Sequence, residues 1–374
     1  MESVKKIILF LGDADFHRGV LLGVGDFTAN HREWAVQKYI PFRTEEDLRV
    51  WLTEAHDAQG IIAHVNSREQ AAVFRGFAGR VVNISSRDKA FGLPTVTADN
   101  FEMGRLAAIH LLGRGFRHFA WVGRAFFFSY ERLRGFRETL REHGLDCTDL
   151  SEVSTIRPQF LQPLIQKLPK PVGIFTEDDE AALQISSACN SGGWRVPDEV
   201  AVLGCNNDEP ICLLGYPQRS SVDIAARNIG FEAASLLDKL MLGDREPECP
   251  ILIKPGGVTV RGSTDVHAVG DPQLGKALRY IRENLALEIG VPDLVQAAGI
   301  SRRVLERRCR ERLGHTPLEE IRRARIRRAK ELLLQTDLPM SIVAERAGFQ
   351  SAERMATLFR RETGTTPSRF RQQK

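Results

Sequence analysis

Short apolar runs alternate with amphipathic, helix-like segments over the first 260 residues. The clearest strand-like runs cover residues 5–11, 60–65, 80–85, 118–123, 172–176 and 199–204. Strands that alternate with helices are typical of a parallel α/β sheet covered on both faces. A last strand-like run, residues 251–260, is followed by a Gly- and Asp-containing segment that is typical of a linker.

Strand signals disappear after residue 273, and the remainder is typical of short helices. Glycine and proline interrupt the helical pattern at 290–292, 299, 314–317, 337–339, 348 and 364–367. We therefore expect two domains, an α/β domain over residues 1–268 and an all-α domain over residues 269–374. A chain of 374 residues also exceeds the size at which one hydrophobic core stops growing.

The positive charge of the chain is concentrated in its last third. Residues 270–374 contain 22 Lys and Arg against 13 Asp and Glu, a net charge of +9, whereas residues 1–269 carry a net charge of −5. This asymmetry indicates a polyanion such as double-stranded DNA as the partner of the second domain.

The sequence offers little support for catalysis, metal binding or export. It lacks a phosphate-binding loop, a Gly-x-Gly-x-x-Gly turn after a strand, a nucleophile motif and a Cys-x-x-Cys pair. The first apolar run is too short for a signal peptide, and no run has the length of a membrane span. We expect a cytoplasmic, non-enzymatic protein without cofactor or metal, whose cysteines are reduced.

The C-terminal domain contains an internal repeat of about 50 residues. Gly299 aligns with Gly348, and after one inserted residue Ser301 aligns with Ser351. The later matches are Leu305 with Met355, Arg310 with Arg360, Gly314 with Gly364, and Thr316-Pro317 with Thr366-Pro367. Each copy has a short helix, an Ala-Gly turn, an apolar residue and a serine that can cap a second helix, which is the pattern of a helix-turn-helix unit.

The second helix of each copy carries the candidate DNA contacts. They are Ser301, Arg302, Arg303 and Arg307 in the first copy, and Ser351, Glu353, Arg354 and Thr357 in the second. Arginine donates two hydrogen bonds to guanine, whereas serine at a helix start suits a phosphate. The alternative for each arginine is a solvated face or a phosphate contact, and it is the stronger alternative for Arg354.

Residues 318–335 are predicted to form one long helix between the two copies. Its apolar side consists of Ile321, Ile326, Ala329 and Leu333, and its arginine run at 322–328 suits a solvated face. A rigid connector fixes the spacing of the two recognition helices, which must be roughly 34 Å if they enter successive major grooves.

These motifs resemble the DNA-binding domain of the arabinose-regulator (AraC) family. The resemblance is carried by AAGISRRVLER in the first copy and by the closing pattern of residues 347–371. It implies one chain segment with two helix-turn-helix units joined by a long helix. Arg354 and Met355 stand where that family often carries an aromatic pair.

The N-terminal domain resembles the sugar-binding core of LacI-type repressors and periplasmic binding proteins. The phrases that carry the resemblance are VTADNFEMGRLAAIHLLGRGFRHFAWVG, ERLRGFRETLREHGL, GIFTEDDEAALQISSACNSGGWRVPDEVAVLGCNND and SSVDIAARNIGFEAASLL. They imply two α/β lobes connected by three crossovers, with a small ligand in the cleft. We expect no helix-turn-helix before this core, where one usually stands, because the first strand-like run begins at Lys5.

The same resemblance implies ligand-binding positions. Arg132 matches the sugar-binding arginine of these cores, and Asp178 or Asp179 matches a polar position at a strand end. Asn206, followed by Asn207, stands where such cores usually have aspartate. Vicinal hydroxyl groups need bidentate donors and paired acceptors, which these side chains supply.

The residues themselves add candidates on both sides of the cleft. Asp13 and Asp15 follow the first strand and either close the cleft from the other lobe or cap a helix. One ring of the run 126–128, of which we select Phe128, is expected to cover a sugar face, with core packing as the alternative.

A LacI-type sensor followed by an AraC-type reader resembles the xylose-operon regulator (XylR) family. The resemblance implies a sequence-specific transcription regulator that responds to a pentose such as D-xylose and activates catabolic genes, as a homodimer that contacts RNA polymerase. Two alternatives remain: a regulator or repressor that senses another small molecule, and a transport-type sugar-binding protein or sugar-processing enzyme. The missing export signal and the +9 tail argue against the second.

Overall fold

The computed structural model describes residues 4–12, 14–39, 45–88, 91–151, 157–248, 250–265, 271–336 and 338–372. The chain divides into two compact units, Met1–Asp265 and Val266–Lys374, which are treated separately below and are called the sensor unit and the DNA-binding unit after the roles expected from the sequence. The boundary expected near residue 268 lies outside the described residues. Among the described helices, none combines the length and apolar character needed to cross a membrane.

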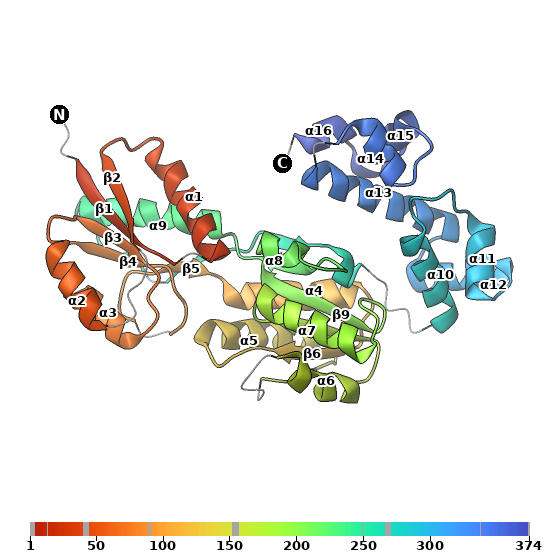
Figure 1. Ribbon diagram of the computed structural model, residues 1–374, viewed down its shortest axis with the longest axis horizontal. Helices are drawn as coiled ribbons and strands as arrows, with labels where there is room; N and C mark the ends of the chain where they lie inside the picture. The colour runs from red at the N-terminus through yellow and green to blue at the C-terminus, as the bar shows by residue number, and fades with distance from the viewer. Residues whose placement is uncertain are drawn as a thin grey trace. The chain divides into compact units, whose positions relative to one another are not determined.

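The first lobe of the sensor unit is built on a parallel sheet with strand order β2-β1-β3-β4. The strands are β1 (Lys5–Phe10), β2 (Trp34–Tyr39), β3 (Gly60–Ala63) and β4 (Arg80–Asn83). Helices α2 (Glu45–Glu54) and α3 (Arg68–Arg75) cover one face, whereas α1 (Asp15–Thr28) and α9 (Ala226–Met241) lie on the other (Figure 1). Phe10, Trp51 and Phe74 fill the core under α2 and α3.

The second lobe contains a six-stranded sheet of order β12-β10-β9-β8-β6-β7. Its strands are β6 (His118–Val122), β7 (Cys147–Asp149), β8 (Val172–Thr176), β9 (Val200–Asn206), β10 (Ser220–Asp223) and β12 (Gly257–Thr259). Its helices are α4 (Asn100–Gly113), α5 (Phe127–Glu142), α6 (Pro158–Lys167), α7 (Asp179–Gly192), α8 (Glu209–Leu213) and the 3-10 turn η1 (Gly262–Thr264). The pairs are parallel except β10 with β12.

Three chain crossovers connect the two lobes. The first contains β5 (Val96–Ala98), the second leads from β10 into α9, and the third contains β11 (Ile251–Ile253). Strands β5 and β11 pair in parallel, so the first and third crossovers are hydrogen-bonded to each other. The two-lobed, three-crossover architecture implied by the resemblance is thus confirmed.

Several strands differ from the sequence-based expectation. The run 251–260 forms two strands because Pro255 and Gly256 interrupt it, and proline has no N–H to donate. Four strands were not predicted: β2, β5, β7 and β10. Strand β10 has the sequence SSVD, whose serines are buried although they are polar.

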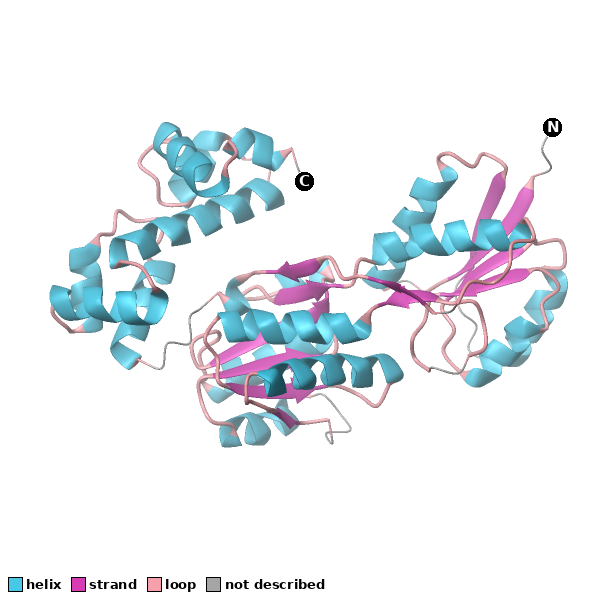
Figure 2. Cartoon of the chain, turned by 180° about the vertical axis from the view of Figure 1, so that it is seen from behind, coloured by secondary structure: helices cyan, strands magenta, loops and turns pink. Residues whose placement is uncertain are grey.

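The DNA-binding unit is entirely helical over its described residues (Figure 2). Its helices are α10 (Pro272–Glu283), α11 (Val291–Ala298), α12 (Arg302–Leu313), α13 (Pro317–Gln335), α14 (Met340–Arg346), α15 (Ala352–Thr363) and α16 (Pro367–Arg371). Helix α13 contributes Ile321 to a first core and Ile326, Ala329 and Leu333 to a second. The predicted long connector and its apolar side are confirmed.

Close helix crossings set the position of α1, whose first turn reaches the cleft. A β-carbon at Gly23 of α1 would lie 1.8 Å from the carbonyl oxygen of Arg227 at the start of α9. At Gly25, two residues further along the same helix, a β-carbon would meet nothing within 4 Å.

We expect Gly23→Ala to lower the free energy of unfolding of the sensor unit by about 3 kcal/mol, because the two backbones must separate. Gly25→Ala should raise the free energy of unfolding by about 0.5–1 kcal/mol, since alanine has a higher helix propensity than glycine at an exposed position. Calorimetric unfolding of the two full-length variants checks this. Equal shifts for both would refute the close crossing.

Candidate functional site

A pocket of about 340 Å³ lies between the lobes, beside the second crossover. Lobe one contributes the start of α1, and lobe two contributes the end of β9. The lining residues are Asp15, Phe16, Gly19, Asn206, Asn207, Asp223, 225–228 and Gly256. Carboxylates, amides and one aromatic ring therefore face a common space, as the recognition of a small polar ligand requires.

The turn after β9 supplies the two asparagines. Asn206 and Asn207 have φ values of 98° and 57°, a backbone region that asparagine tolerates better than most residues. The amide oxygen of Asn206 accepts a hydrogen bond from Arg132 Nη2 at 3.2 Å. The amide nitrogen of Asn207 lies 3.5 Å from Asp223 Oδ2. Both side chains are thus held at the pocket wall.

The buried side chain of Arg132 holds this wall in place by hydrogen bonds. Its side chain is 3% exposed, and its Nε donates to Asn100 Oδ1 at 2.9 Å. Its Nη1 donates to the carbonyl oxygen of Glu177, and the guanidinium lies 5.0 Å from the ring centroid of Phe128. Arg132 therefore connects the ends of β8 and β9 to the first crossover, and its direct contact with a ligand stays a prediction.

The two predicted aspartates have different surroundings, and neither lines the pocket described above. Asp178 caps α7 by accepting from the Ala181 amide at 2.7 Å, and it pairs with Arg124 at 2.9 Å. Asp179 is 1% exposed and accepts from the Asp208 amide at 2.7 Å. Burial raises the pKa of Asp179 to about 7. Asp179 thereby holds the turn that carries the asparagines.

Glu177, which the sequence analysis did not single out, lies directly after β8. Its side chain is fully buried, and both carboxylate oxygens accept hydrogen bonds from Arg124, one of them from the backbone amide at 2.9 Å. Arg124 and Arg87 lie over the ring of Phe126, at 5.4 and 4.6 Å from its centroid. The only sequence signal was a third acidic residue in TEDD, beside the two aspartates that were chosen.

Phe128 stacks on Phe126 with ring centroids 5.5 Å apart and covers Arg132. Its amide donates to the carbonyl oxygen of Ser86 at 3.1 Å, so the strand ends of the two lobes touch here. Contact of this ring with a sugar stays a prediction.

The lobe-one side of the cleft combines charge and aromatic surface. Asp15 lines the pocket and pairs with Arg18 at 3.1 Å, whereas the predicted Asp13 lies outside the described residues. Phe16 packs edge-on against His17 and His64 at centroid distances of 5.4 and 5.9 Å. Burial lowers the pKa of His64 to about 3, so this histidine is neutral near pH 7.

The candidate DNA interface consists of the exposed faces of α12 and α15. Ser301 and Ser351 cap these helices by accepting from the amides of Val304 and Arg354. The predicted capping role of both serines is confirmed. Leu305 and Met355 are buried at equivalent positions of the repeat and anchor α12 and α15 in their respective cores.

The predicted DNA-contacting side chains are exposed and held only by surface contacts. Arg302 pairs with Glu306 at 2.8 Å and Arg307 pairs with Glu311 at 3.3 Å. Arg303 is exposed and forms no ion pair among the described residues. In the second copy Arg354 donates to Gln350, and Thr357 donates to the carbonyl oxygen of Glu353 at 2.9 Å. Exposed ion pairs contribute about 0–1 kcal/mol, so phosphates can replace them.

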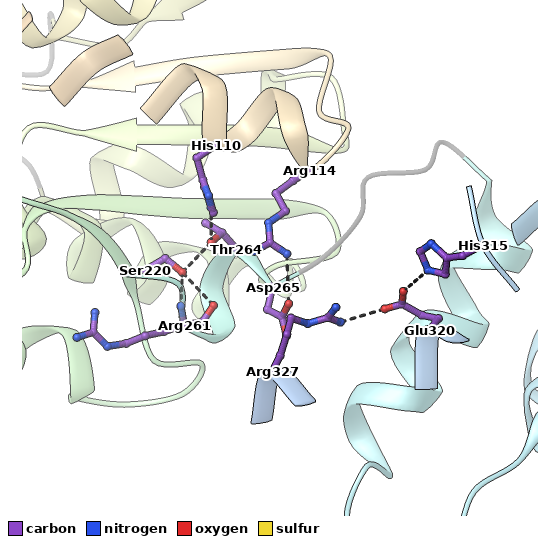
Figure 3. Close-up of polar contacts among 9 residues, drawn as sticks. All are labelled: His110, Arg114, Ser220, Arg261, Thr264, Asp265, His315, Glu320 and Arg327. Atoms are coloured by element: carbon purple, nitrogen blue, oxygen red, sulfur yellow. Dashed lines mark hydrogen bonds and ion pairs between the residues drawn. The ribbon is translucent and has the colours of Figure 1, made fainter. Parts of the chain in front are cut away.

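A buried polar cluster joins α12 to α13. His315 Nε2 lies 2.6 Å from Glu320 Oε2, and Arg327 Nη2 lies 3.0 Å from Glu320 Oε1 (Figure 3). Arg323 Nη1 lies 3.2 Å from His315 Nδ1. Arg322, Arg323 and Arg328 of the arginine run are exposed, as expected for a solvated face, and Arg323 and Arg327 also contact the polar cluster at the helix junction.

The two helix-turn-helix units differ at their turn glycines. Gly299 and Gly348 both have positive φ, at 65° and 80°. A β-carbon at Gly299 would meet open space, whereas one at Gly348 would lie 1.9 Å from the carbonyl oxygen of Leu285 in the loop after α10. The turn of the second helix-turn-helix therefore packs against the loop that follows α10. This contact fixes the spacing of the two recognition helices, α12 and α15.

Comparison with known proteins agrees with this arrangement. Residues 108–264 match the family model of a periplasmic binding protein-like domain, and residues 294–373 match a helix-turn-helix domain. A two-lobed sensor followed by a double helix-turn-helix unit defines a DNA-binding transcription regulator.

Full-length relatives give the family. The xylose operon regulatory protein of Haemophilus influenzae is 32% identical over 288 residues, 74% of each chain. That of Escherichia coli K12 is 28% identical over 380 residues, 97% of this chain and 96% of the relative. The solved structure of the xylose-binding transcription activator XylR matches with a TM-score of 0.74 and 26% identity, over 98% of this chain and 97% of that one. The chain belongs to the xylose operon regulatory protein family.

We expect Gly348→Ala to weaken DNA binding far more than Gly299→Ala. Both substitutions place alanine in the left-handed region, at a cost of about 1–2 kcal/mol. Only Gly348→Ala also forces the two helix-turn-helix units apart. Fluorescence anisotropy with a DNA duplex selected by the wild-type protein measures the difference. Equal losses would mean that docking at Leu285 does not set the spacing.

Proposed function

We propose that D-xylose, or another pentose, occupies the pocket between the lobes and acts as the effector of this regulator. The observation that carries the proposal is the convergence of Asp15, Asn206, Asn207 and Asp223 on one pocket of about 340 Å³. This volume lies at the small end of ligand pockets, which suits a monosaccharide. The named ligand of the related XylR structure supports the same choice.

The chemistry of the wall suits a polyol. Carboxylates of Asp15 and Asp223 accept from hydroxyl groups, and the amides of Asn206 and Asn207 supply both donors and acceptors. Hydrogen bonds to ionised partners are the stronger ones and reward a ligand whose hydroxyls lie in matching positions. The Phe16 ring offers an apolar surface for the C–H groups of the sugar.

A ligand that touches both lobes stabilises the closed form in proportion to its difference in affinity for the two forms. A shift from 1:99 to 99:1 needs about 5.5 kcal/mol of difference, which several charge-assisted hydrogen bonds supply. In the proposed mechanism, closure rearranges a cytoplasmic homodimer so that its DNA-binding units occupy adjacent half-sites. The resulting complex contacts RNA polymerase and activates sugar catabolism genes.

On DNA, we infer that α12 and α15 enter major grooves. Arg303 and Arg307 on α12 are the candidates for contacts with base edges. Glu353, Arg354 and Thr357 are the corresponding candidates on α15. Ser301 and Ser351, at the helix starts, suit phosphate contacts, as does Arg302.

We expect Asp223→Asn to weaken D-xylose binding about 10- to 100-fold, because a neutral amide replaces a charged acceptor. Asparagine retains the oxygen that accepts from the Ala225 amide, so the turn is preserved. Titration calorimetry measures binding, with L-arabinose, D-ribose and D-glucose as comparators.

The matched control is Asp99→Asn on the first crossover. Asp99 caps α4 by accepting from the Glu102 amide, a role that asparagine fills equally well, and it does not line the pocket. Unchanged binding in Asp223→Asn, or equal losses in both variants, would argue against this pocket. Absence of heat with every sugar in the wild type would argue against a sugar effector.

Arg303→Ala should weaken specific DNA binding by about 1–3 kcal/mol and relax the preference at one base position. Arg322→Ala, which removes an exposed arginine from α13 outside the recognition helices, changes the net charge equally. We expect that control to weaken binding to all sequences alike and by less. Selection of binding sites from a random DNA pool with each variant distinguishes the two results.

A further inference from the structure

The segment that leaves the sensor unit toward the DNA-binding unit is bonded to a pocket residue. Arg261 is 5% exposed, and its Nη2 donates to the amide oxygen of Asn207 at 2.9 Å. Its Nη1 donates to the carbonyl oxygen of Arg219 at 3.0 Å. Only residues 262–265 separate Arg261 from the second unit of the chain. A residue of the exit segment, which we define as residues 261–265, thus reaches the pocket wall.

Side-chain hydroxyls, rather than a regular strand pairing, hold the exit segment on β10. The Arg261 amide donates to Ser220 Oγ at 2.8 Å, and Ser220 Oγ contacts the Arg261 carbonyl oxygen at 2.9 Å (Figure 3). Thr264 Oγ1 lies 2.7 Å from Ser220 Oγ and 2.8 Å from His110 Nε2. Burial lowers the pKa of His110 to about 3, so this contact is between neutral groups near pH 7.

The segment ends in an ion pair. Asp265 Oδ1 lies 3.3 Å from Nη1 of Arg114, the residue that follows the last turn of α4 (Figure 3). Strand β10 therefore contributes to both structures: Ser220 at its start holds the exit segment, and Asp223 at its end lines the pocket. Only two residues of the strand separate Ser220 from Asp223.

The Arg261 bond also determines what Asn207 presents to a ligand. Because its oxygen accepts from a guanidinium, the Asn207 side chain directs its amide nitrogen to Asp223 and the pocket. The reverse amide orientation would place two donors against each other. A ligand that rotates the Asn207 side chain must therefore also displace Arg261 or break a charge-assisted hydrogen bond.

We propose that Arg261 is a positioning residue that orients Asn207 for effector recognition and transmits pocket occupancy to the exit segment. The transmission step rests on the proposed role of the pocket as the effector site. The path runs from Asn207 through Arg261 to Ser220 and Thr264.

The first test needs no effector and uses the full-length chain. Asn207→Gly removes the side chain without strain, since glycine accepts positive φ, and Ala225→Gly is the control at another positive-φ position, where only a methyl group is lost. Loss of a charge-assisted bond should speed amide hydrogen exchange of residues 261–264 at least about tenfold in Asn207→Gly only. Equal exchange in the two variants would overturn the proposal.

The second test measures the coupling itself. Thr264→Val removes the hydroxyl between Ser220 and His110, and Thr139→Val is the control: Thr139 is also buried in lobe two, but its hydroxyl donates to the Gly135 carbonyl oxygen within α5. We expect both variants to bind D-xylose within about threefold of the wild type, but only Thr264→Val to lose the typically 5- to 150-fold effect of sugar on DNA affinity.

DNA affinity is measured with a duplex selected by the wild-type protein, with and without D-xylose. A wild-type sugar effect retained in Thr264→Val would overturn the transmission step. If the wild type does not bind D-xylose, the effector proposal fails, and the exchange comparison still decides whether Arg261 joins the pocket to the exit segment.

Discussion

A buried guanidinium organises the effector side of this regulator. Charged groups are rarely buried unless they are paired or fully hydrogen-bonded, and Arg132 meets this requirement through the amide oxygens of Asn100 and Asn206 and the carbonyl oxygen of Glu177. These partners come from the first crossover and the ends of β9 and β8. Because each bond satisfies a charge that is expensive to bury, the strand ends and the crossover hold one arrangement, and the pocket wall follows from it.

The fold was predictable from the sequence wherever structure depends on local pattern. Apolar runs gave the central strands of both sheets, and the serine, glycine and proline positions gave the double helix-turn-helix with its capped recognition helices. Strand β10 was missed because SSVD carries no apolar run; Ser220 is buried through hydrogen bonds to Arg261 and Ser263, some 40 positions away. Polar burial of this kind depends on distant partners, which a local pattern does not contain.

The candidate site was predictable in part for the same reason. The resemblance marked Asn206 and Asn207, which line the pocket, and Arg132, which supports it. Asp223 and Arg261 were not found because their relation to the pocket exists only after β10 and η1 have packed beside β9. The place of Asp179 in a strand-end motif suggested a ligand contact, which stays a prediction; its carboxylate is buried against the Asp208 amide, a contact that no local pattern contains.

The unequal glycines of the two DNA-binding units have an evolutionary consequence. Two duplicated copies begin with the same freedom to change, but Gly348 is enclosed by the Leu285 carbonyl while Gly299 faces open space. Drift in the turn and register of the second copy is therefore opposed by a steric constraint that the first copy does not share. The constraint is confined to the turn, so the exposed side chains of α15 stay free to change while the glycine before them does not.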